Sequence, residues 1–334
     1  MLVKVLNSYE WNQVYSAWRR YYEQLGQQAA FTAFFEPEKF FAPDGNTVGI
    51  PLKLGKTFSG EHNVVMSVQI YKQLLNHFTE QFPNVPPFPD DELVIKKYQV
   101  IEPFKATTNN ILSKYKSKAK KLNKQRERIE KAHQEVQLAK RLVISEKNYM
   151  FIAIDIEAYE RDHSIILELG WSIFDSRKNR FMDQHYLIDS YAHLNNGTFV
   201  EDQKLKFSFG TSVWCSLAQA LKELRKDLDW AVERDGGFVL VGHGLSSDLK
   251  YLSKQKFMWP AVNGGEVLDV NQSACIAIVN TDTIYGSSIN DLHNPPSLGR
   301  TLDLLGIETW NLHNSGNDAH YTMLLFLTLV NYEG

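Results

Sequence analysis

Cysteine and long apolar runs are scarce in this chain. Its 334 residues contain only two cysteines, Cys215 and Cys275. Two thiols are too few for a disulfide framework or a cysteine zinc site, which favours a reducing cytoplasmic or nuclear compartment. The longest apolar candidate, residues 323–330, contains a threonine and falls far short of the ~20 residues that a membrane span needs. The first residues carry Glu10 and lack a long apolar core, so we expect neither a secretory signal nor a transit peptide there.

The overall composition is that of an ordinary globular protein. Hydrophobic residues make up 43% and charged residues 22% of the chain, which excludes collagen-like, low-complexity and largely disordered proteins. The length leaves room for about two domains of ~150 residues each.

The small net charge of −3 hides an uneven distribution along the chain. Residues 1–148 hold 22 Lys and Arg against 15 Asp and Glu, whereas residues 149–334 hold 14 against 24. Much of the positive charge lies in residues 105–147, which contain 13 basic and four acidic residues. One part of the chain is therefore suited to attract polyanions, while the other gathers carboxylates.

The first half of the sequence predicts a mostly helical region, in which short elements are followed by one long basic helix. Residues 8–24 and 63–82 have helical patterns, and residues 35–62 are broken into loops and short strands. In the basic segment, apolar residues recur every seven positions at Tyr115, Leu122, Ile129, Val136 and Val143. That stripe predicts a long helix, and three roles stay open for it: a solvated helix on the protein surface, a nucleic-acid arm or a weak coiled coil.

The second half of the sequence predicts an α/β domain. Buried-strand patterns occur at residues 149–157, 165–175, 185–188 and 237–243, and a strand-like run at 276–284. Helical patterns occur at 212–233, from about 246, at 298–306 and at 317–330. We expect a mixed sheet flanked by helices. The predicted organisation is an N-terminal α+β region (1–104), a long basic helix or linker (105–148) and the α/β domain (149–334).

Two carboxylates follow the first buried strand of this domain. Asp155 and Glu157 are two residues apart, so on a strand they point to the same face. Buried side by side they repel each other, and a divalent cation between them removes the repulsion, since hard cations take oxygen ligands. The alternative is that both are turn residues that point into water.

Two further acids lie in the first turns of predicted helices. Asp248 follows a buried strand in VGHGLSSD, and Asp318 opens the last helix, five residues after His313 on a glycine-containing loop. Each acid taken alone is equally consistent with a simple helix-terminal residue. We interpret four other histidines of this half as structural or surface residues, namely His163, His185, His193 and His320.

Together these elements resemble the DEDDh family of 3′→5′ exonucleases, the DnaQ-like branch of the ribonuclease H-like superfamily. Glu168 and Gly170 match the second strand of that family, and the resemblance covers about residues 149–331. It implies a ribonuclease H-like sheet and four acids, Asp155, Glu157, Asp248 and Asp318, that hold two divalent ions, Mg²⁺ or Mn²⁺. It also implies that His313 is the general base, and Asn314 stands where the sister class has a tyrosine.

The sequence departs from the family pattern at the neighbours of these acids. Ala158-Tyr159-Glu160 replaces the usual Thr-Thr-Gly, and Gly244 and Ser247 replace an asparagine and an aromatic residue. Ala158, Tyr159 and His243 are the nearby candidates for nucleotide contacts. The domain is also similar to the C-terminal domain of fungal proteins linked to mRNA transport.

The resemblance implies a metal-dependent 3′→5′ exonuclease that acts on RNA or single-stranded DNA and releases nucleoside 5′-monophosphates. Asp155 would bridge two cations, Glu157 would orient the attacking water and His313 would take its proton. We expect the basic helix to contact phosphates through Lys118, Lys120, Lys121 and Lys124.

Two other functions remain open. One is a catalytically weak nucleic-acid-binding or adaptor protein in RNA metabolism or mRNA export. The other is a metal-free scaffold that binds a protein partner through the basic helix. The expected partners are single-stranded 3′ ends and a protein on the helix, with no membrane, in the cytoplasm, the nucleus or both.

Overall fold

The computed structural model describes residues 5–41, 49–89 and 92–331. It separates into two compact units, Met1–Arg128 and Ile129–Gly334. Within the described ranges, no helix combines the length and the apolar character that crossing a membrane requires. Both cysteines are free thiols.

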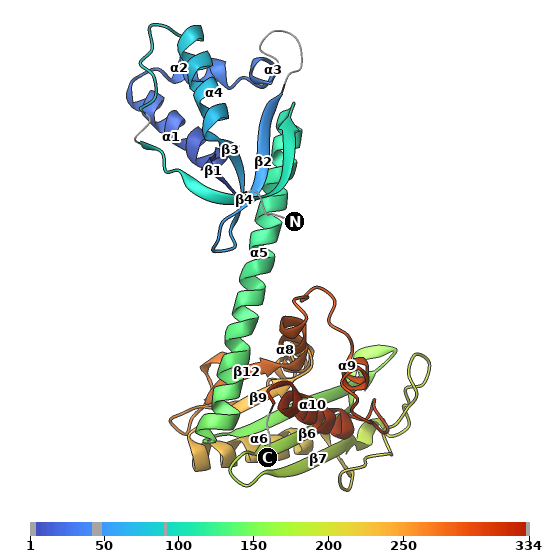
Figure 1. Cartoon of the computed structure of the whole chain (residues 1–334). Coiled ribbons are helices and arrows are strands. Elements are labelled where there is room, and N and C mark those ends of the chain that lie inside the picture. Colours follow the sequence, from blue (N-terminus) through green and yellow to red (C-terminus); the bar gives the residue numbers. More distant parts are fainter. Residues whose placement is uncertain (1–4, 42–48, 90–91, 332–334) are drawn as a thin grey trace. The chain divides into compact units, whose positions relative to one another are not determined.

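A small closed barrel forms the first unit (Figure 1). Its strands pair antiparallel in the order β1-β3-β2-β4, and β4 pairs again with β1. The strands are β1 (Val5–Glu10), β2 (Ile50–Lys56), β3 (His62–Ser67) and β4 (Lys96–Ala106). The accompanying helices are α1 (Trp11–Gln24), α2 (Gln28–Phe34), α3 (Pro37–Phe40) and α4 (Val68–Gln81).

Aromatic side chains fill the core of this unit. Trp18 and Tyr22 on α1 are fully buried and pack against Phe78 on α4. The helix expected over residues 63–82 is wrong in its first part, because His62–Ser67 is strand β3. Ser67 is the residue at which the strand gives way to the helix, since its hydroxyl oxygen accepts from the Ile70 N–H at 3.3 Å and caps α4.

The long basic helix is present as α5 (Asn109–Lys140), which continues as a π-helical segment over Arg141–Glu146. The basic segment also includes the last two residues of β4, Lys105 and Ala106. The residues of α5 that are buried are mostly small, namely Leu112, Ala119, Ala132 and Ala139. Small side chains let the helix lie close to its neighbours while its long cationic side chains stay in water.

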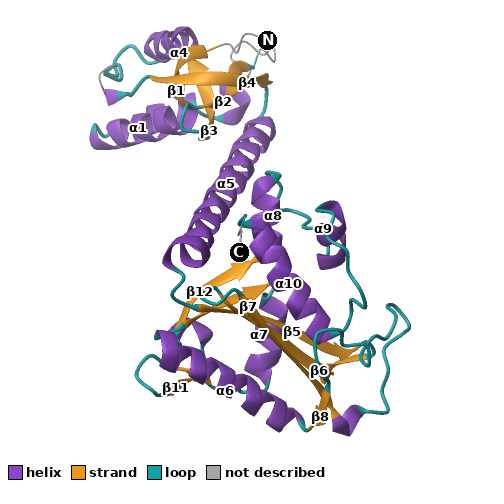
Figure 2. Cartoon of the chain, turned by 60° about the horizontal axis from the view of Figure 1, so that its bottom comes forward, coloured by secondary structure: helices purple, strands orange, loops and turns teal. Residues whose placement is uncertain are grey.

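A six-stranded mixed sheet forms the second unit (Figure 2), in the order β12-β9-β5-β6-β7-β8. β5 pairs antiparallel with β6 and parallel with β9, which places it at the centre. Its strands are β5 (Met150–Tyr159), β6 (Asp162–Asp175), β7 (Arg180–Ile188), β8 (Val213–Cys215), β9 (Phe238–Gly242) and β12 (Cys275–Asn280). This arrangement confirms the expected mixed α/β fold with a helical N-terminal region.

Helices cover both faces of the sheet (Figure 2). They are α6 (Leu217–Asp235), α7 (Ser246–Lys254), α8 (Thr281–Ser288), α9 (Leu298–Leu304) and α10 (Ser315–Leu329). The strand expected over 276–284 ends at Asn280, and α8 begins directly after it. The helix expected from residue 212 begins at Leu217, after strand β8. The shorter elements are a 3-10 turn at Asp189–Tyr191, another at Val270–Gln272, and the paired strands β10 (Trp259–Pro260) and β11 (Glu266–Val267).

The two faces of β5 pack against different cores. Ile152 and Ile154 belong to the core that includes α6, whereas Phe151 and Ala153 belong to the core that includes α10. Because side chains alternate between the two faces of a strand, those of Asp155 and Glu157 point to the same face as Phe151 and Ala153, which is the face that α10 covers.

The start of α10 lies directly on β6, and glycine makes this contact possible. A Cβ atom added to Gly170 on β6 would lie 2.3 Å from the Ser315 carbonyl carbon and 2.4 Å from the Gly316 nitrogen. These are backbone atoms that cannot rotate away. Strand and helix backbone therefore touch at this point, and the contact fixes the height of α10 above the sheet.

We expect the Gly170→Ala variant to lower the free energy of unfolding by about 1–3 kcal/mol, because the new methyl group must push α10 off β6. Urea unfolding checks this. The matched control is Gly265→Ala, where the nearest atom to the added Cβ is 3.9 Å away. Equal unfolding free energies for both variants would contradict the close contact.

Candidate functional site

Asp155 and Glu157 lie on the α10 side of the sheet, near the end of β5. Asp155 pairs with Gly170 and Glu157 pairs with Glu168 across the antiparallel β5–β6 ladder. Residues that face each other across a ladder project to the same side of a sheet. Three carboxylates are thus neighbours at this end of the ladder, Asp155 and Glu157 on β5 and Glu168 on β6.

Asp248 reaches the same strand from the first turn of α7. The pairing of β5 with β9 ends at Ala153 and Val241, so the Ile156 N–H has no strand partner on that side. The Asp248 Oδ1 atom accepts a hydrogen bond from this N–H at 3.0 Å. One oxygen of the carboxylate is thereby anchored to β5.

Asp318 comes from the first turn of α10 and is almost fully buried. Its Oδ2 atom accepts from the His313 N–H at 3.0 Å. His313 is exposed on the preceding loop and has a φ of +68°, a left-handed conformation that is unusual for a residue other than glycine. The Asn314 side chain caps α10 by accepting from the Asn317 N–H.

Burial raises the pKa of each acid in the cluster, and neighbouring carboxylates raise it further at Asp155, Glu157 and Asp318. Burial, followed by the charges of Asp318, Asp248, Glu157 and Glu168, raises the pKa of Asp155 well above its usual range. Burial and the same group of acids raise the pKa of Glu157 to about 8. Burial raises the pKa of Asp248 to about 7 and that of Asp318 to about 7. Crowded acids of this kind are a hallmark of functional sites rather than of stable cores.

Two carboxylate oxygens in the cluster are buried without a hydrogen-bond partner, Asp155 Oδ2 and Asp318 Oδ1. In addition, single ligand atoms of Glu157, His313 and Asp318 all lie within 4.8 Å of one another. Buried oxygens that lack a donor, grouped with further oxygen and imidazole ligands, suit a hard divalent cation. The site can hold metal.

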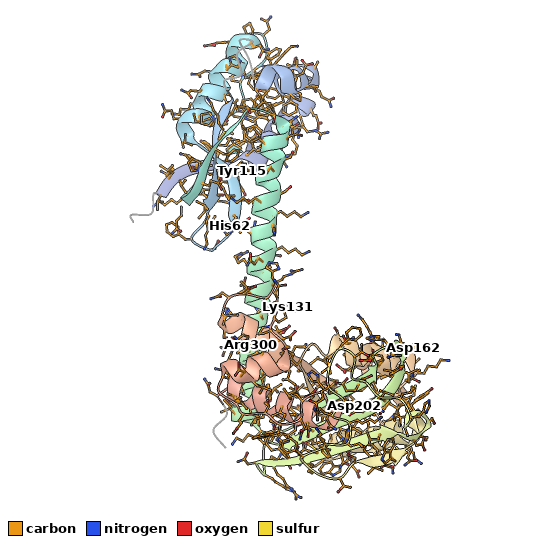
Figure 3. All side chains as sticks on the ribbon, turned by 90° about the vertical axis from the view of Figure 1, so that its right-hand side faces the viewer. His62, Tyr115, Lys131, Asp162, Asp202 and Arg300 are labelled. Atoms are coloured by element: carbon orange, nitrogen blue, oxygen red, sulfur yellow. The ribbon has the colours of Figure 1, made fainter. Side chains whose placement is uncertain are left out.

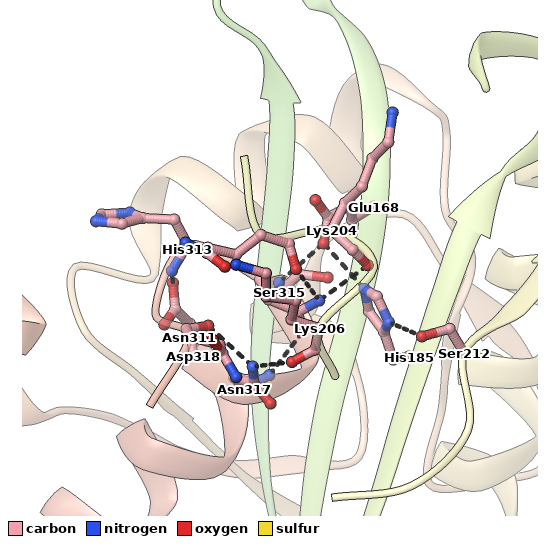
Figure 4. Close-up of polar contacts among 12 residues, drawn as sticks. Glu168, His185, Lys204, Lys206, Ser212, Asn311, His313, Ser315, Asn317 and Asp318 are labelled. Carbon is pink, nitrogen blue, oxygen red and sulfur yellow. Dashed lines mark hydrogen bonds and ion pairs between the residues drawn. The ribbon is translucent and has the colours of Figure 1, made fainter. Parts of the chain in front are cut away.

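Glu168 is a buried member of the site that sequence reasoning identified only through a family match. Its Oε2 atom accepts from the Ser315 N–H at 3.1 Å and lies 2.9 Å from His185 Nε2 (Figure 4). His185 Nδ1 in turn lies 2.8 Å from the Ser212 hydroxyl. The available signal was a single acid within the apolar run ILELGW. His185, interpreted from the sequence as a structural or surface residue, is fully buried with a carboxylate partner, and the network joins β6, β7 and α10.

A cavity of about 260 Å³ opens beside Glu157 and His313. The segment 194–204 forms one wall, and its Lys204 ammonium group is held by the Leu194 carbonyl at 2.5 Å and by the Asn195 side chain. The Glu160 carboxylate accepts from backbone N–H groups of this segment, those of Gly197, Thr198 and Phe199. The Glu160 side chain, close behind the first motif, thus fastens a loop over the site.

The remaining residues singled out from sequence lie in different places. Ala158 lines the same cavity, and Tyr159 follows it at the end of β5. Both ring nitrogens of His243 are bonded within the chain, one to the Thr281 hydroxyl and one to the Pro296 carbonyl, each at 2.9 Å. The lysines Lys118, Lys120, Lys121 and Lys124 lie on α5 in the first unit.

Curated proteins of two fungi are similar to this chain. It is 30% identical over 213 residues to "Uncharacterized protein YDR514C" of Saccharomyces cerevisiae, a match that covers 57% of this chain and 43% of that protein. It is 31% identical over 187 residues to "Uncharacterized nucleolar protein C2C4.08" of Schizosaccharomyces pombe, covering 54% and 68%. It is 30% identical over 207 residues to "Good for full DBP5 activity protein 2" of Saccharomyces cerevisiae, covering 56% and 36%.

The chain spans less than half the length of both Saccharomyces cerevisiae relatives. A protein family matches residues 150–329, which is more than half of the chain and includes all four acids and His313. This match confirms the resemblance inferred from the motifs. The chain belongs to the DEDDh_C family, described as the DNA polymerase III subunit epsilon-like, C-terminal domain.

Proposed function

We propose that the protein is a metal-dependent 3′→5′ exonuclease of single-stranded RNA or DNA. The observation that carries the proposal is the pair of buried carboxylate oxygens without a donor, Asp155 Oδ2 and Asp318 Oδ1, inside a cluster of acids with raised pKa values. Membership of the family supports a nuclease-type fold. The direction of degradation and the release of nucleoside 5′-monophosphates rest on that membership.

Asp155, Glu157, Asp248 and Asp318 would hold two divalent cations, Mg²⁺ or Mn²⁺. Two such ions stabilise the charge that develops on the attacking and leaving oxygens of a phosphodiester. The donor set fits them because it consists of carboxylate oxygens, which Mg²⁺ and Mn²⁺ prefer. Asp155, which is surrounded by the other acids of the cluster, would be one of the residues that hold these ions.

The chain orients these acids through its own backbone. Asp248 and Asp318 each have one oxygen held by a backbone N–H, that of Ile156 and that of His313. The other oxygen of each side chain is left to face the site. Glu168 is a positioning residue, since it holds the start of α10 through the Ser315 N–H.

His313 is assigned as the general base. Burial of part of the ring lowers the pKa of His313, so the imidazole is neutral at neutral pH and is able to accept a proton from water. Glu157, whose ligand atom lies within 4.8 Å of that of His313, orients this water. His313 is exposed and lines the cavity beside Glu157, and its backbone has a left-handed conformation.

Substrate contacts are assigned to two regions. Ala158 and Tyr159 adjoin the cavity beside Glu157 and are suited to meet the terminal nucleotide, and His243 is a third candidate at the strand-to-helix junction. On α5, the lysines Lys118, Lys120, Lys121 and Lys124 are proposed to contact phosphates.

A second candidate function is that of a catalytically weak adaptor in RNA metabolism or mRNA export. The specific observation that favours it is Glu160, whose carboxylate is used to fasten the loop at Gly197–Phe199 instead of being free for substrate. One relative is named for full DBP5 activity, and another is named a nucleolar protein. The second name supports a nuclear location for this chain as well.

The Asp155→Asn variant tests the first proposal. We expect wild-type protein with Mg²⁺ or Mn²⁺ to shorten a 5′-labelled single strand one nucleotide at a time, and EDTA or the variant to abolish shortening. The matched control is Asp229→Asn, which removes the same charge from an exposed position on α6. Retained binding without any shortening by the wild type would favour the adaptor function instead.

The His313→Gln variant separates a base from a ligand. Loss of a general base is expected to reduce kcat roughly 10²–10⁴-fold and to remove the acidic limb of the pH–rate profile. The rise in Tm that Mn²⁺ produces should persist. Loss of that rise would mean that His313 binds metal, which contradicts its assignment as the base.

The raised carboxyl pKa values predict how stability depends on pH without metal. In the folded state these groups keep their protons up to pH about 7–8, whereas in the unfolded chain they lose them near pH 4. The folded state therefore binds more protons between these values, and stability falls as pH rises through this window. We expect the Tm in EDTA to drop from pH 5 to pH 8 more in wild type than in Asp155→Asn, and Mg²⁺ to reduce the drop. The same drop in both proteins would show that the carboxylate cluster is not its origin.

A further inference from the structure

The first unit contains a polar groove between its barrel and the long helix. The groove has a volume of about 750 Å³ and is formed by β3, the start of α1 and the middle of α5. It is lined by Asn12, His62, Asn63, Val64, Lys116, Ser117, Ala119, Lys120, Asn123, Lys124 and Glu127. None of these residues belongs to the acidic site of the second unit.

Two reciprocal hydrogen bonds hold the walls of this groove together. The His62 N–H donates to the Asn123 Oδ1 atom at 2.7 Å, and the Asn123 amide donates to the His62 carbonyl at 2.9 Å. Figure 3 shows His62 beside α5. The Arg126 guanidinium also donates to the Ser59 carbonyl at 3.2 Å, in the turn that precedes β3. These hydrogen bonds fix the distance between α5 and β3 and therefore the width of the groove.

Three lysines on one face of α5 line the groove. Lys116, Lys120 and Lys124 are spaced four residues apart, which places them in a row along the helix. In the described ranges the structure gives none of the three an acidic partner. Lys118, on another face, is instead paired with Glu102, which also accepts from the Tyr115 hydroxyl at 2.6 Å.

One lysine of the row, Lys116, is half-buried, whereas Lys120 and Lys124 are exposed at the mouth of the groove. Burial lowers the pKa of Lys116, whose ammonium group lies 6.0 Å from the centre of the Trp11 ring. Glu127 is the one acid among the described residues that line the groove. An excess of cations in a partly desolvated groove attracts an anion more strongly than the same cations would in open solvent.

The length of the row selects the kind of anion. Lys116 and Lys124 are eight residues apart, which is about 12 Å along a helix. A single phosphate cannot contact both ends of such a row, whereas a chain of phosphates can. The Asn12 and Asn63 amides and the Ser117 hydroxyl add neutral hydrogen-bonding groups beside the cations. These groups are suited to sugar and phosphate oxygens.

We infer that this groove binds the sugar–phosphate backbone of single-stranded nucleic acid through Lys116, Lys120 and Lys124. The inference rests on the proposed function for the class of ligand, but the binding itself requires neither metal nor cleavage. It also divides the lysines of α5. Of the four lysines proposed above to contact phosphates, Lys120 and Lys124 lie in the groove with Lys116, whereas Lys118 and Lys121 lie outside it and would contact the strand only beyond the groove.

Fluorescence anisotropy of the full chain in EDTA tests this inference without relying on cleavage. The probes are labelled 20-nucleotide single strands, oligo(U) and oligo(dT), titrated at several salt concentrations. The test variant is Lys116→Gln/Lys120→Gln/Lys124→Gln. The matched control is Lys72→Gln/Lys97→Gln/Lys114→Gln, which removes three exposed lysines of the same unit that do not line the groove.

We expect the groove variant to bind both strands at least about tenfold more weakly than the control variant. Its slope of log K against log salt should be smaller by about 2, since each lost phosphate contact on a single strand removes ~0.7. Thermal melts of both variants establish that each is folded. Equal affinities for the two variants would overturn the inference.

A poly-glutamate competitor of matched charge distinguishes nucleic acid from an acidic protein segment. If the groove variant loses affinity for poly-glutamate but keeps affinity for both strands, an acidic polypeptide is the ligand and the inference is wrong. A wild-type protein that binds strands in EDTA through the groove, but does not shorten them when Mg²⁺ or Mn²⁺ is supplied in a separate assay, would refute the exonuclease proposal alone.

Discussion

The repulsion among buried carboxylates is the constraint on which the second unit depends. Asp155, Glu157 and Glu168 lie close together at one end of the β5–β6 ladder, next to strand residues such as Phe151 and Ala153 that belong to the apolar core. Asp248 and Asp318 add to the same cluster from two helices. Because these carboxylates crowd together and are largely withdrawn from water, protonation or a bound cation is needed to offset their mutual repulsion. This end of the sheet is therefore folded, but within the described residues its carboxylates lack a compensating positive charge.

The surrounding fold holds this arrangement by rigid, short-range contacts. Gly170 lets the α10 backbone touch β6, and Glu168 ties the same helix start through the Ser315 N–H. The Ile156 N–H at the edge of β5 orients Asp248. The stabilising apolar contacts lie farther along the strands, where Phe151 packs on Phe326. The apolar contacts that stabilise the fold and the carboxylates that repel one another thus occupy different parts of the same strand. This arrangement is common in sites that bind charged ligands.

Local patterns in the sequence were enough to predict the mixed sheet and the family. The two-residue spacing of Asp155 and Glu157 on an apolar strand has only one geometric meaning once the strand is accepted. Local patterns gave the wrong secondary structure where the same residues fit both the helical and the strand periodicity. The run from Val64 to Ser67 fits either a strand or the first turn of a helix, and only pairing with β1 and β2 decides in favour of the strand. The barrel was missed for the same reason. The Glu168–His185 contact needs the register of β6 against β7, which no single segment carries.

The closed barrel of the first unit has a consequence for how that unit recruits other molecules. Within the described residues each of its four strands has a hydrogen-bonded neighbour on both sides. A sheet that closes on itself leaves little free edge to which an extended peptide could add as another strand. Recognition by this unit therefore depends mainly on side chains, so its specificity is open to change by surface substitution without rebuilding the backbone.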